Sequence, residues 1–150
     1  MSVIVPLNLP QTKLVLTRTD NQLFVQCLIR GKKLVLTPEE WVRQHFISYL
    51  NQQLNYPITR IAVEKSIQYA GLTKRWDIVV YDSDFQPQIL VECKAPKIPI
   101  TIDTLYQALT YQKEMQGKYI ALTNGLDHAY FGVDSEKNSL CELTQLPTND

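Results

Sequence analysis

The stretch that decides the fold is Arg75-Trp-Asp-Ile-Val-Val-Tyr81, followed by Ile89-Leu-Val-Glu-Cys-Lys-Ala95. Both runs are rich in bulky apolar residues, as expected of strands that are buried in a sheet. The segment between them, Asp82-Ser-Asp-Phe-Gln-Pro87, has the composition of a turn. Together these features predict an antiparallel β-hairpin whose second strand is apolar at its start and charged at its end.

The end of this hairpin is predicted to bring three charged side chains together. Side chains alternate between the faces of a strand, so Glu92 and Lys94 are expected on one face and Cys93 on the opposite, packed face. Opposed residues in an antiparallel pair have a constant index sum. A turn centred between positions 84 and 85 therefore places Asp77 opposite Glu92, with about 4.5–5.5 Å between their Cβ atoms.

A pair of carboxylates at this separation indicates a site for a cation, because the two charges otherwise repel each other. Mg²⁺ is the natural partner, since it prefers oxygen ligands, accepts few carboxylates and keeps several waters. Lys94 would lie beside such a water, in position to orient or deprotonate it. A plain alternative stays open: a solvated cross-strand ion pair that contributes about 0–1 kcal/mol.

The clearest helix start is at Thr37. Thr37 at the N-cap, Pro38 at the first helical position and Glu40 at the third form a capping box, and the helix is expected to continue through Leu50 and stop before Tyr56-Pro57. Further strands are expected over 13–17, 22–26, 32–36, 58–69, 119–123, 129–133 and 140–146, and a second helix over 102–116. Strands that bracket two helices predict an α/β or α+β sheet domain with a crossover helix in its second half.

Length and composition limit the class of protein. A chain of 150 residues with 45% hydrophobic content is expected to form one domain over 1–150, with N-terminal strands in 1–36 and a core in 37–147. The balance of 15 basic and 15 acidic residues excludes a globally basic nucleic-acid binder, but not a local basic patch. Three widely spaced cysteines indicate a reducing, cytoplasmic compartment, and no apolar run is long enough to cross a membrane.

Four blocks along the chain resemble a known family. They are Leu36-Thr-Pro-Glu-Glu-Trp-Val-Arg-Gln44, Lys74-Arg-Trp-Asp77, Val91-Glu-Cys-Lys-Ala-Pro96 and Leu122-Thr-Asn-Gly125. The Asp and Glu-x-Lys elements resemble the PD-(D/E)xK motif of restriction-endonuclease-like nucleases. In this order, the four blocks resemble the stand-alone form of the type I restriction enzyme R protein N-terminal domain. The chain departs from the named motif at Trp76, where the motif has proline.

The resemblance implies a central mixed β-sheet flanked by helices, preceded here by an N-terminal β-hairpin, and a Mg²⁺-dependent endonuclease that hydrolyses DNA phosphodiester bonds. Mn²⁺ is expected to substitute for Mg²⁺. By the same resemblance, Asp77 and Glu92 would ligate the metal together with the backbone carbonyl of Cys93, and Lys94 would be the catalytic lysine. The resemblance therefore predicts that Asp77, Glu92, Cys93 and Lys94 lie close together in the folded protein.

Further site residues follow from the same resemblance. Glu40 would complete the metal site from the first helix, although its capping position already explains it, and Glu39 is the neighbouring alternative. Glu64 is a fallback acid. Gln107 and Tyr111 have the Gln-xxx-Tyr spacing of related nucleases. Residues four apart share one helix face, so both side chains could be directed toward the site. The alternative is an ordinary amphipathic helix, in which Tyr111 packs against the core and Gln107 is solvated.

Five basic residues are candidates for contacts to DNA phosphates: Lys74, Arg75 and Lys97 around the site, and Lys32 and Lys33 in the N-terminal region. DNA is the implied partner, and a homo-oligomer or a larger restriction or defence assembly fits the same resemblance. Because fold does not dictate function, a non-catalytic DNA-binding or protein-interaction module that retains the nuclease fold stays open. A purely structural ion-pair cluster at Asp77, Glu92 and Lys94 is the third interpretation.

Overall fold

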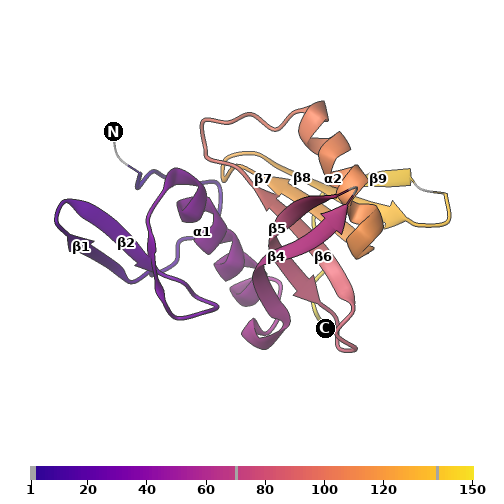
Figure 1. Cartoon of the computed structure of the whole chain (residues 1–150). Coiled ribbons are helices and arrows are strands. Elements are labelled where there is room, and N and C mark those ends of the chain that lie inside the picture. The colour runs from indigo at the N-terminus through magenta and orange to yellow at the C-terminus, as the bar shows by residue number, and fades with distance from the viewer. Residues whose placement is uncertain (1–2, 70, 138) are drawn as a thin grey trace.

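Two β-sheets and two α-helices make up the part of the chain that the structure describes (Figure 1). This computed structural model describes residues 3–69, 71–137 and 139–150, without the side chains of residues 65–69, 72, 74 and 111–114. The architecture is α+β with a mixed central sheet and flanking helices, which confirms the class predicted from the sequence.

The central sheet has six strands in the order β4-β5-β6-β7-β8-β9. They are β4 (Ile61–Tyr69), β5 (Leu72–Tyr81), β6 (Pro87–Cys93), β7 (Tyr119–Thr123), β8 (His128–Asp134) and β9 (Ser139–Leu143). Strands β6 and β7 pair in parallel and are connected by α2 (Ile102–Met115), whereas the other neighbours pair antiparallel. The predicted crossover helix in the second half is therefore confirmed.

The central strands bury both of their faces. One apolar cluster joins α1 (Pro38–Gln52) to one face of the sheet and includes Phe46, Leu50, Ile78, Val91 and Cys93. The other cluster joins α2 to the opposite face and includes Trp76, Leu90, Ala108, Ile120 and Leu122. This two-sided burial explains why β5 and β6 are nearly continuous apolar runs. Among the described helices, none is long and apolar enough to cross a membrane.

Helix α1 begins where the sequence predicts. The Thr37 hydroxyl accepts a hydrogen bond from the Glu40 N–H at 3.0 Å, and Pro38 is the first helical residue. These contacts satisfy donors at the start of the helix that have no partner within it. The helix extends slightly beyond the predicted Leu50, to Gln52.

A second sheet, of three strands in the order β1-β2-β3, precedes α1. Its strands are β1 (Leu16–Thr19), β2 (Gln22–Gln26) and β3 (Lys33–Val35). The bounds predicted for the first strand, 13–17, are wrong: the strand covers Leu16–Thr19, and Asp20 and Asn21 alone form the turn, with φ of 49° and 66°. Two consecutive residues with positive φ make a tight hairpin turn whose twist matches the flanking strands, so β1 extends to Thr19.

The predicted strand over 58–69 also needs correction. Its first residues, Ile58–Arg60, form a 3-10 turn, and β4 begins at Ile61. The Arg60 N–H donates to the carbonyl of Pro57 at 2.9 Å. Because the backbone of Ile58–Arg60 forms this local hydrogen bond, these residues do not pair with the neighbouring strand, although their side chains favour a strand.

Gly125, in the turn after β7, has no room for a side chain. Its φ is +87°, and a Cβ would lie 2.7 Å from Cδ2 of Leu7 and 3.0 Å from Cγ2 of Val42. We expect Gly125→Ala to lower the free energy of unfolding by about 2–4 kcal/mol, from backbone strain and overpacking together. Gly31→Ala is the control, because φ there is +72° but nothing lies within 4 Å. Equal losses in urea unfolding would contradict the packing argument.

Candidate functional site

The β5–β6 hairpin has the predicted register. The pairs are Ile78–Val91, Val79–Leu90 and Val80–Ile89. The regular pairing ends at Ile78–Val91, so the predicted pair of Asp77 and Glu92 lies one step beyond it. There the Asp77 carboxylate accepts the backbone N–H of Cys93 at 2.8 Å. The side chain of Asp77 thus accepts a hydrogen bond from β6, a role that a backbone carbonyl of the neighbouring strand has elsewhere in a β-ladder.

The end of β6 shows the predicted alternation. Cys93 is buried, with 1% exposure, while Glu92 and Lys94 on either side are half-buried. The backbone N–H of Lys94 donates to the carbonyl of Thr123 at 2.8 Å, which extends the pairing with β7. Burial, and then the Asp77 carboxylate, raise the pKa of the Cys93 thiol well above its usual range. The thiol therefore stays protonated, and only the backbone carbonyl of Cys93 is suited to bind a cation.

A buried arginine lies among the acidic residues of the site. Arg43, which is 8% exposed, places Nη1 at 3.1 Å from Glu64 and Nε at 3.4 Å from Glu40. Its Nη2 lies 3.7 Å from Asp77 and 3.7 Å from Glu39. These five residues, which come from α1, β4 and β5, are called here the Arg43 cluster. The sequence analysis missed Arg43, although its spacing from Glu39 and Glu40 is a signal for helical ion pairs.

The two candidate acids of α1 have different surroundings. The Glu40 carboxylate is buried and accepts a hydrogen bond from Gln44 at 2.9 Å, in addition to its pairing with Arg43. Glu39 is more open. Burial and then the Asp77 charge raise the pKa of the Glu39 carboxyl, while Arg43 and Lys94 act to lower it. The charges of both Asp77 and Lys94 therefore act on the pKa of Glu39, in opposite directions.

Glu64 belongs to the same cluster. Its carboxylate lies 3.0 Å from Arg30, 3.1 Å from Arg43 and 3.9 Å from Arg75. Burial opposes its ionisation, but the hydrogen bond from Arg30 and the charges of the three arginines outweigh burial and lower the pKa of the Glu64 carboxyl. The sequence analysis ranked Glu64 only as a fallback, because nothing local shows which way a mid-strand acid points.

The backbone is irregular at this point of the sheet. Glu64 has φ of +55°, which is uncommon for a residue other than glycine. Trp76 and Ile78 are two residues apart in β5 yet pack in different apolar clusters. The regular alternation of side chains between the two faces of β5 is therefore interrupted at Asp77, where the pairing with β4 also skips Glu64. Irregular pairing of this kind re-aims side chains at functional sites in many proteins.

The other predicted site residues lie in less enclosed positions. Arg75 is exposed and lies 3.9 Å from a carboxylate oxygen of the Arg43 cluster. Lys97 is exposed in the segment after β6, and Gln107 is exposed on α2. The side chains of Lys74 and Tyr111 lie outside the described residues. Asp77, Glu92 and Lys94 thus lie at one end of the β5–β6 hairpin, and Arg75 is the predicted DNA contact that pairs with a residue of the Arg43 cluster.

The donor chemistry of the site fits a hard divalent cation. Asp77 and Glu92 offer carboxylates and Cys93 a backbone carbonyl, which are oxygen donors of the kind that Mg²⁺ prefers. Within the described residues, no group of three or more His, Cys, Asp and Glu side chains has metal-binding geometry. Arg43 already places a guanidinium nitrogen 3.7 Å from the Asp77 carboxylate.

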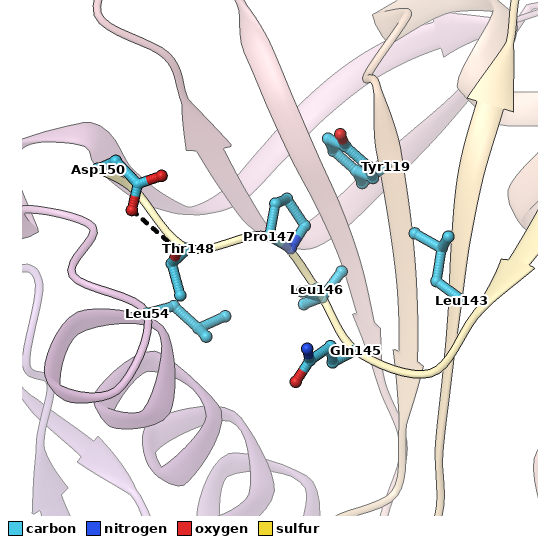
Figure 2. A pocket seen from close by; sticks show the side chains of 8 residues that line it. All are labelled: Leu54, Tyr119, Leu143, Gln145, Leu146, Pro147, Thr148 and Asp150. Atoms are coloured by element: carbon cyan, nitrogen blue, oxygen red, sulfur yellow. Dashed lines mark hydrogen bonds between the residues drawn. The ribbon is translucent and has the colours of Figure 1, made fainter.

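A hollow of about 470 Å³ lies elsewhere, against the C-terminal segment (Figure 2). It is lined by Leu54, Tyr119, Leu143, Gln145, Leu146, Pro147, Thr148 and Asp150. The C-terminal segment is tied to the end of α1, since Asn149 donates to the carbonyl of Leu54 at 2.7 Å and the Tyr56 hydroxyl donates to that of Pro147 at 2.9 Å. This hollow includes none of the predicted site residues.

Comparisons with known proteins show what this α+β domain is similar to. A fragment assigned to the HsdR subunit of a type I restriction enzyme from Vibrio vulnificus YJ016 is similar in structure, with a TM-score of 0.53 and 20% identity. The match covers 73% of this chain but only 23% of that one. Residues 38–147 match the family described as type I restriction enzyme R protein N terminus (HSDR_N), and the chain belongs to this family. No curated protein matches the chain.

Proposed function

We propose that this domain is a Mg²⁺-dependent endonuclease of the PD-(D/E)xK type that hydrolyses DNA phosphodiester bonds, with Mn²⁺ able to substitute. The observation that carries the proposal is the hydrogen bond of 2.8 Å from the Cys93 N–H to the Asp77 carboxylate, because Cys93 lies between Glu92 and Lys94. Membership of a restriction-enzyme R protein family supports it.

Each residue of the hairpin end has a distinct role in this proposal. Asp77 and Glu92 would hold the divalent cation, with the carbonyl of Cys93 as a further oxygen ligand. The cation, when bound, lowers the pKa of water and offsets charge on the scissile phosphate. Lys94 orients the attacking water, which lowers the entropic part of the barrier. Glu39, whose pKa is affected by both Asp77 and Lys94, is the better candidate on α1, because Glu40 is already bound by Gln44 and Arg43.

The surroundings of the site supply contacts to DNA in the same proposal. Arg75, Lys97 and Gln107 are exposed and would meet the phosphate backbone, and Lys74 and Tyr111 remain proposed contacts. A homo-oligomer or a larger restriction assembly would present two such sites to the two strands of a duplex.

One observation favours a second candidate function. Arg43 already places a positive charge 3.7 Å from Asp77, where a bound cation would act. A domain stabilised in this way by its own arginine is suited to be a non-catalytic DNA-binding or protein-interaction module that retains the nuclease fold.

Nicking of supercoiled plasmid tests the proposal. The protein is expected to nick DNA with Mg²⁺ or Mn²⁺ and not in EDTA, and Lys94→Ala is expected to slow nicking by at least about 100-fold with an unchanged unfolding midpoint. Lys137→Ala, at an exposed lysine of the β8–β9 turn, is the matched control. Nicking by Lys94→Ala at the rate of this control would reject the assigned site. DNA binding without nicking under any metal would favour the non-catalytic module.

A further inference from the structure

Positive charge is concentrated in the segment that precedes the family match. Residues 1–37 contain five Lys or Arg and one Asp, a formal charge of +4, while residues 38–150 contain ten basic and 14 acidic residues, a formal charge of −4. The zero net charge of the whole chain conceals this division. A polyanion is therefore attracted to the N-terminal segment and repelled, on average, by the core.

The charges of this segment lie on or beside the sheet β1–β3. All five cations are exposed, namely Lys13, Arg18, Arg30, Lys32 and Lys33. Arg30 also pairs with Glu64 of the Arg43 cluster at 3.0 Å. The one acid, Asp20, lies at the tip of the β1–β2 hairpin. Arg18 and Lys33 lie in β1 and β3, Lys13 and Lys32 lie beside these strands, and the three strands contain no carboxylate. In the strand register Arg18 pairs with Leu23, at the edge of the face that includes Val25.

The sheet has one covered face and one open face. Val25 is fully buried and lies in register between Leu16 and Leu34, so this apolar row is covered. The opposite face carries Thr17, Phe24 and Val35 in one cross-strand row, and Gln26 and Lys33 in the next. The ammonium of Lys33 lies 5.1 Å above the Phe24 ring. The open face therefore combines hydroxyl, amide and ammonium donors, which are the groups that commonly bind DNA phosphates.

Hydrogen bonds hold this sheet in a fixed place relative to the candidate site. After β2, the Leu28 N–H donates to Gln44 at 2.9 Å, and Gln44 donates to Glu40 at 2.9 Å. Arg30 adds hydrogen bonds to the carbonyl of Val63 at 3.1 Å and to Glu64 at 3.0 Å. The segment between β2 and β3 thus contacts the Arg43 cluster directly. Figure 1 shows β1 and β2 on one side of α1 and the six-stranded sheet on the other.

We propose that the sheet β1–β3 and its bordering cations form the surface that holds the phosphate backbone of DNA beside the candidate site. For the identity of the polyanion this inference rests on the proposed function. It adds the positive charge that the family-matched core lacks, on a segment that the family match does not include. Because the segment after β2 fixes this surface to Gln44 and Glu64, DNA held on it keeps a constant position relative to the candidate site.

Binding of a short fluorescent DNA duplex in EDTA, measured by anisotropy over a series of salt concentrations, tests the surface without cleavage. Lys32→Gln with Lys33→Gln is expected to weaken binding at least about tenfold and to reduce the slope of log K against log salt by about two. Lys118→Gln with Lys137→Gln is the matched control. It removes the same charge from exposed lysines outside the N-terminal segment, and its binding should stay within about twofold of wild type in the same assay.

The outcomes separate this inference from the nuclease proposal. Equal weakening by the two double variants would show that only net charge matters and would overturn the surface, as would no binding by the wild type. Displacement of the duplex by polyglutamate more readily than by unlabelled duplex would assign the surface to an acidic protein and also overturn it. Selective weakening by the first pair in a protein that never nicks DNA would support the surface while the nuclease proposal fails. Nicking by that pair at the wild-type rate would overturn the surface alone.

Discussion

Replacing Arg43 by methionine is expected to lower the free energy of unfolding by about 3–5 kcal/mol at neutral pH. Methionine keeps an unbranched apolar stem but removes a buried guanidinium that lies within 3.7 Å of the carboxylates of Glu39, Glu40, Glu64 and Asp77. The carboxylates then face one another without a counter-charge in a partly desolvated place. Urea unfolding of both proteins measures the loss, and Arg43→Lys, which keeps the charge, is expected to lose less.

The loss should depend on pH in a definite direction. Although burial opposes its ionisation, the hydrogen bond from Arg30 and the nearby arginine charges lower the pKa of the Glu64 carboxyl in the folded protein. A lowered folded-state pKa contributes stability that is present above the unfolded pKa and is lost as the pH falls through the folded one. Without Arg43, protonation relieves repulsion instead. The difference between the proteins should therefore narrow below about pH 4, and a constant difference would assign the loss to packing of the arginine stem.

The same variant shows whether Arg43 and a divalent cation share a location. If they do, Mn²⁺ should raise the unfolding midpoint of Arg43→Met more than that of the wild type, because the cation restores the missing positive charge. Equal shifts in the two proteins would place any cation site away from the Arg43 cluster. This readout is independent of DNA cleavage.

Replacing Asp77 by asparagine is expected to reduce metal-dependent nicking by at least about 100-fold with little change in stability. Asp77 has two tasks, because its carboxylate accepts the Cys93 N–H at 2.8 Å and is also a proposed metal ligand. Asparagine keeps a carbonyl oxygen for the hydrogen bond and removes the charge. Single-turnover nicking and urea unfolding of the same samples measure the two tasks separately.

Asp77→Ala is the matched comparison. It removes the acceptor as well as the charge, and it leaves the Cys93 N–H without this partner at a buried position. An unsatisfied buried donor costs about 1–3 kcal/mol, so only the alanine variant should be clearly destabilised. Nicking by the asparagine variant at the wild-type rate would exclude Asp77 as a metal ligand. Equal destabilisation of the two variants would show that the charge, rather than the hydrogen bond, stabilises the end of the hairpin.

Much of the fold follows from local interactions and was predictable. The register of the β5–β6 hairpin, the helix start at Thr37 and the crossover helix each depend on residues near one another in the chain. The errors were local as well. The first strand ends in a two-residue turn at Asp20 and Asn21, which both have positive φ. The residues after Pro57 form a 3-10 turn where a strand was predicted. Amino-acid composition only weakly favours either backbone conformation, so neither could be predicted from it.

By itself, the sequence determined which charged residues stand at the end of β6 and which face they share, because strand alternation and turn length set both. Only the tertiary structure decided what surrounds them. Arg43 pairs with acids from two other elements of the fold, Glu64 on β4 and Asp77 on β5. This pairing depends on how α1 packs across the sheet, because that packing decides which carboxylates lie close to the buried guanidinium. These are long-range consequences of the apolar core, and helical spacing shows only the partners on the same helix.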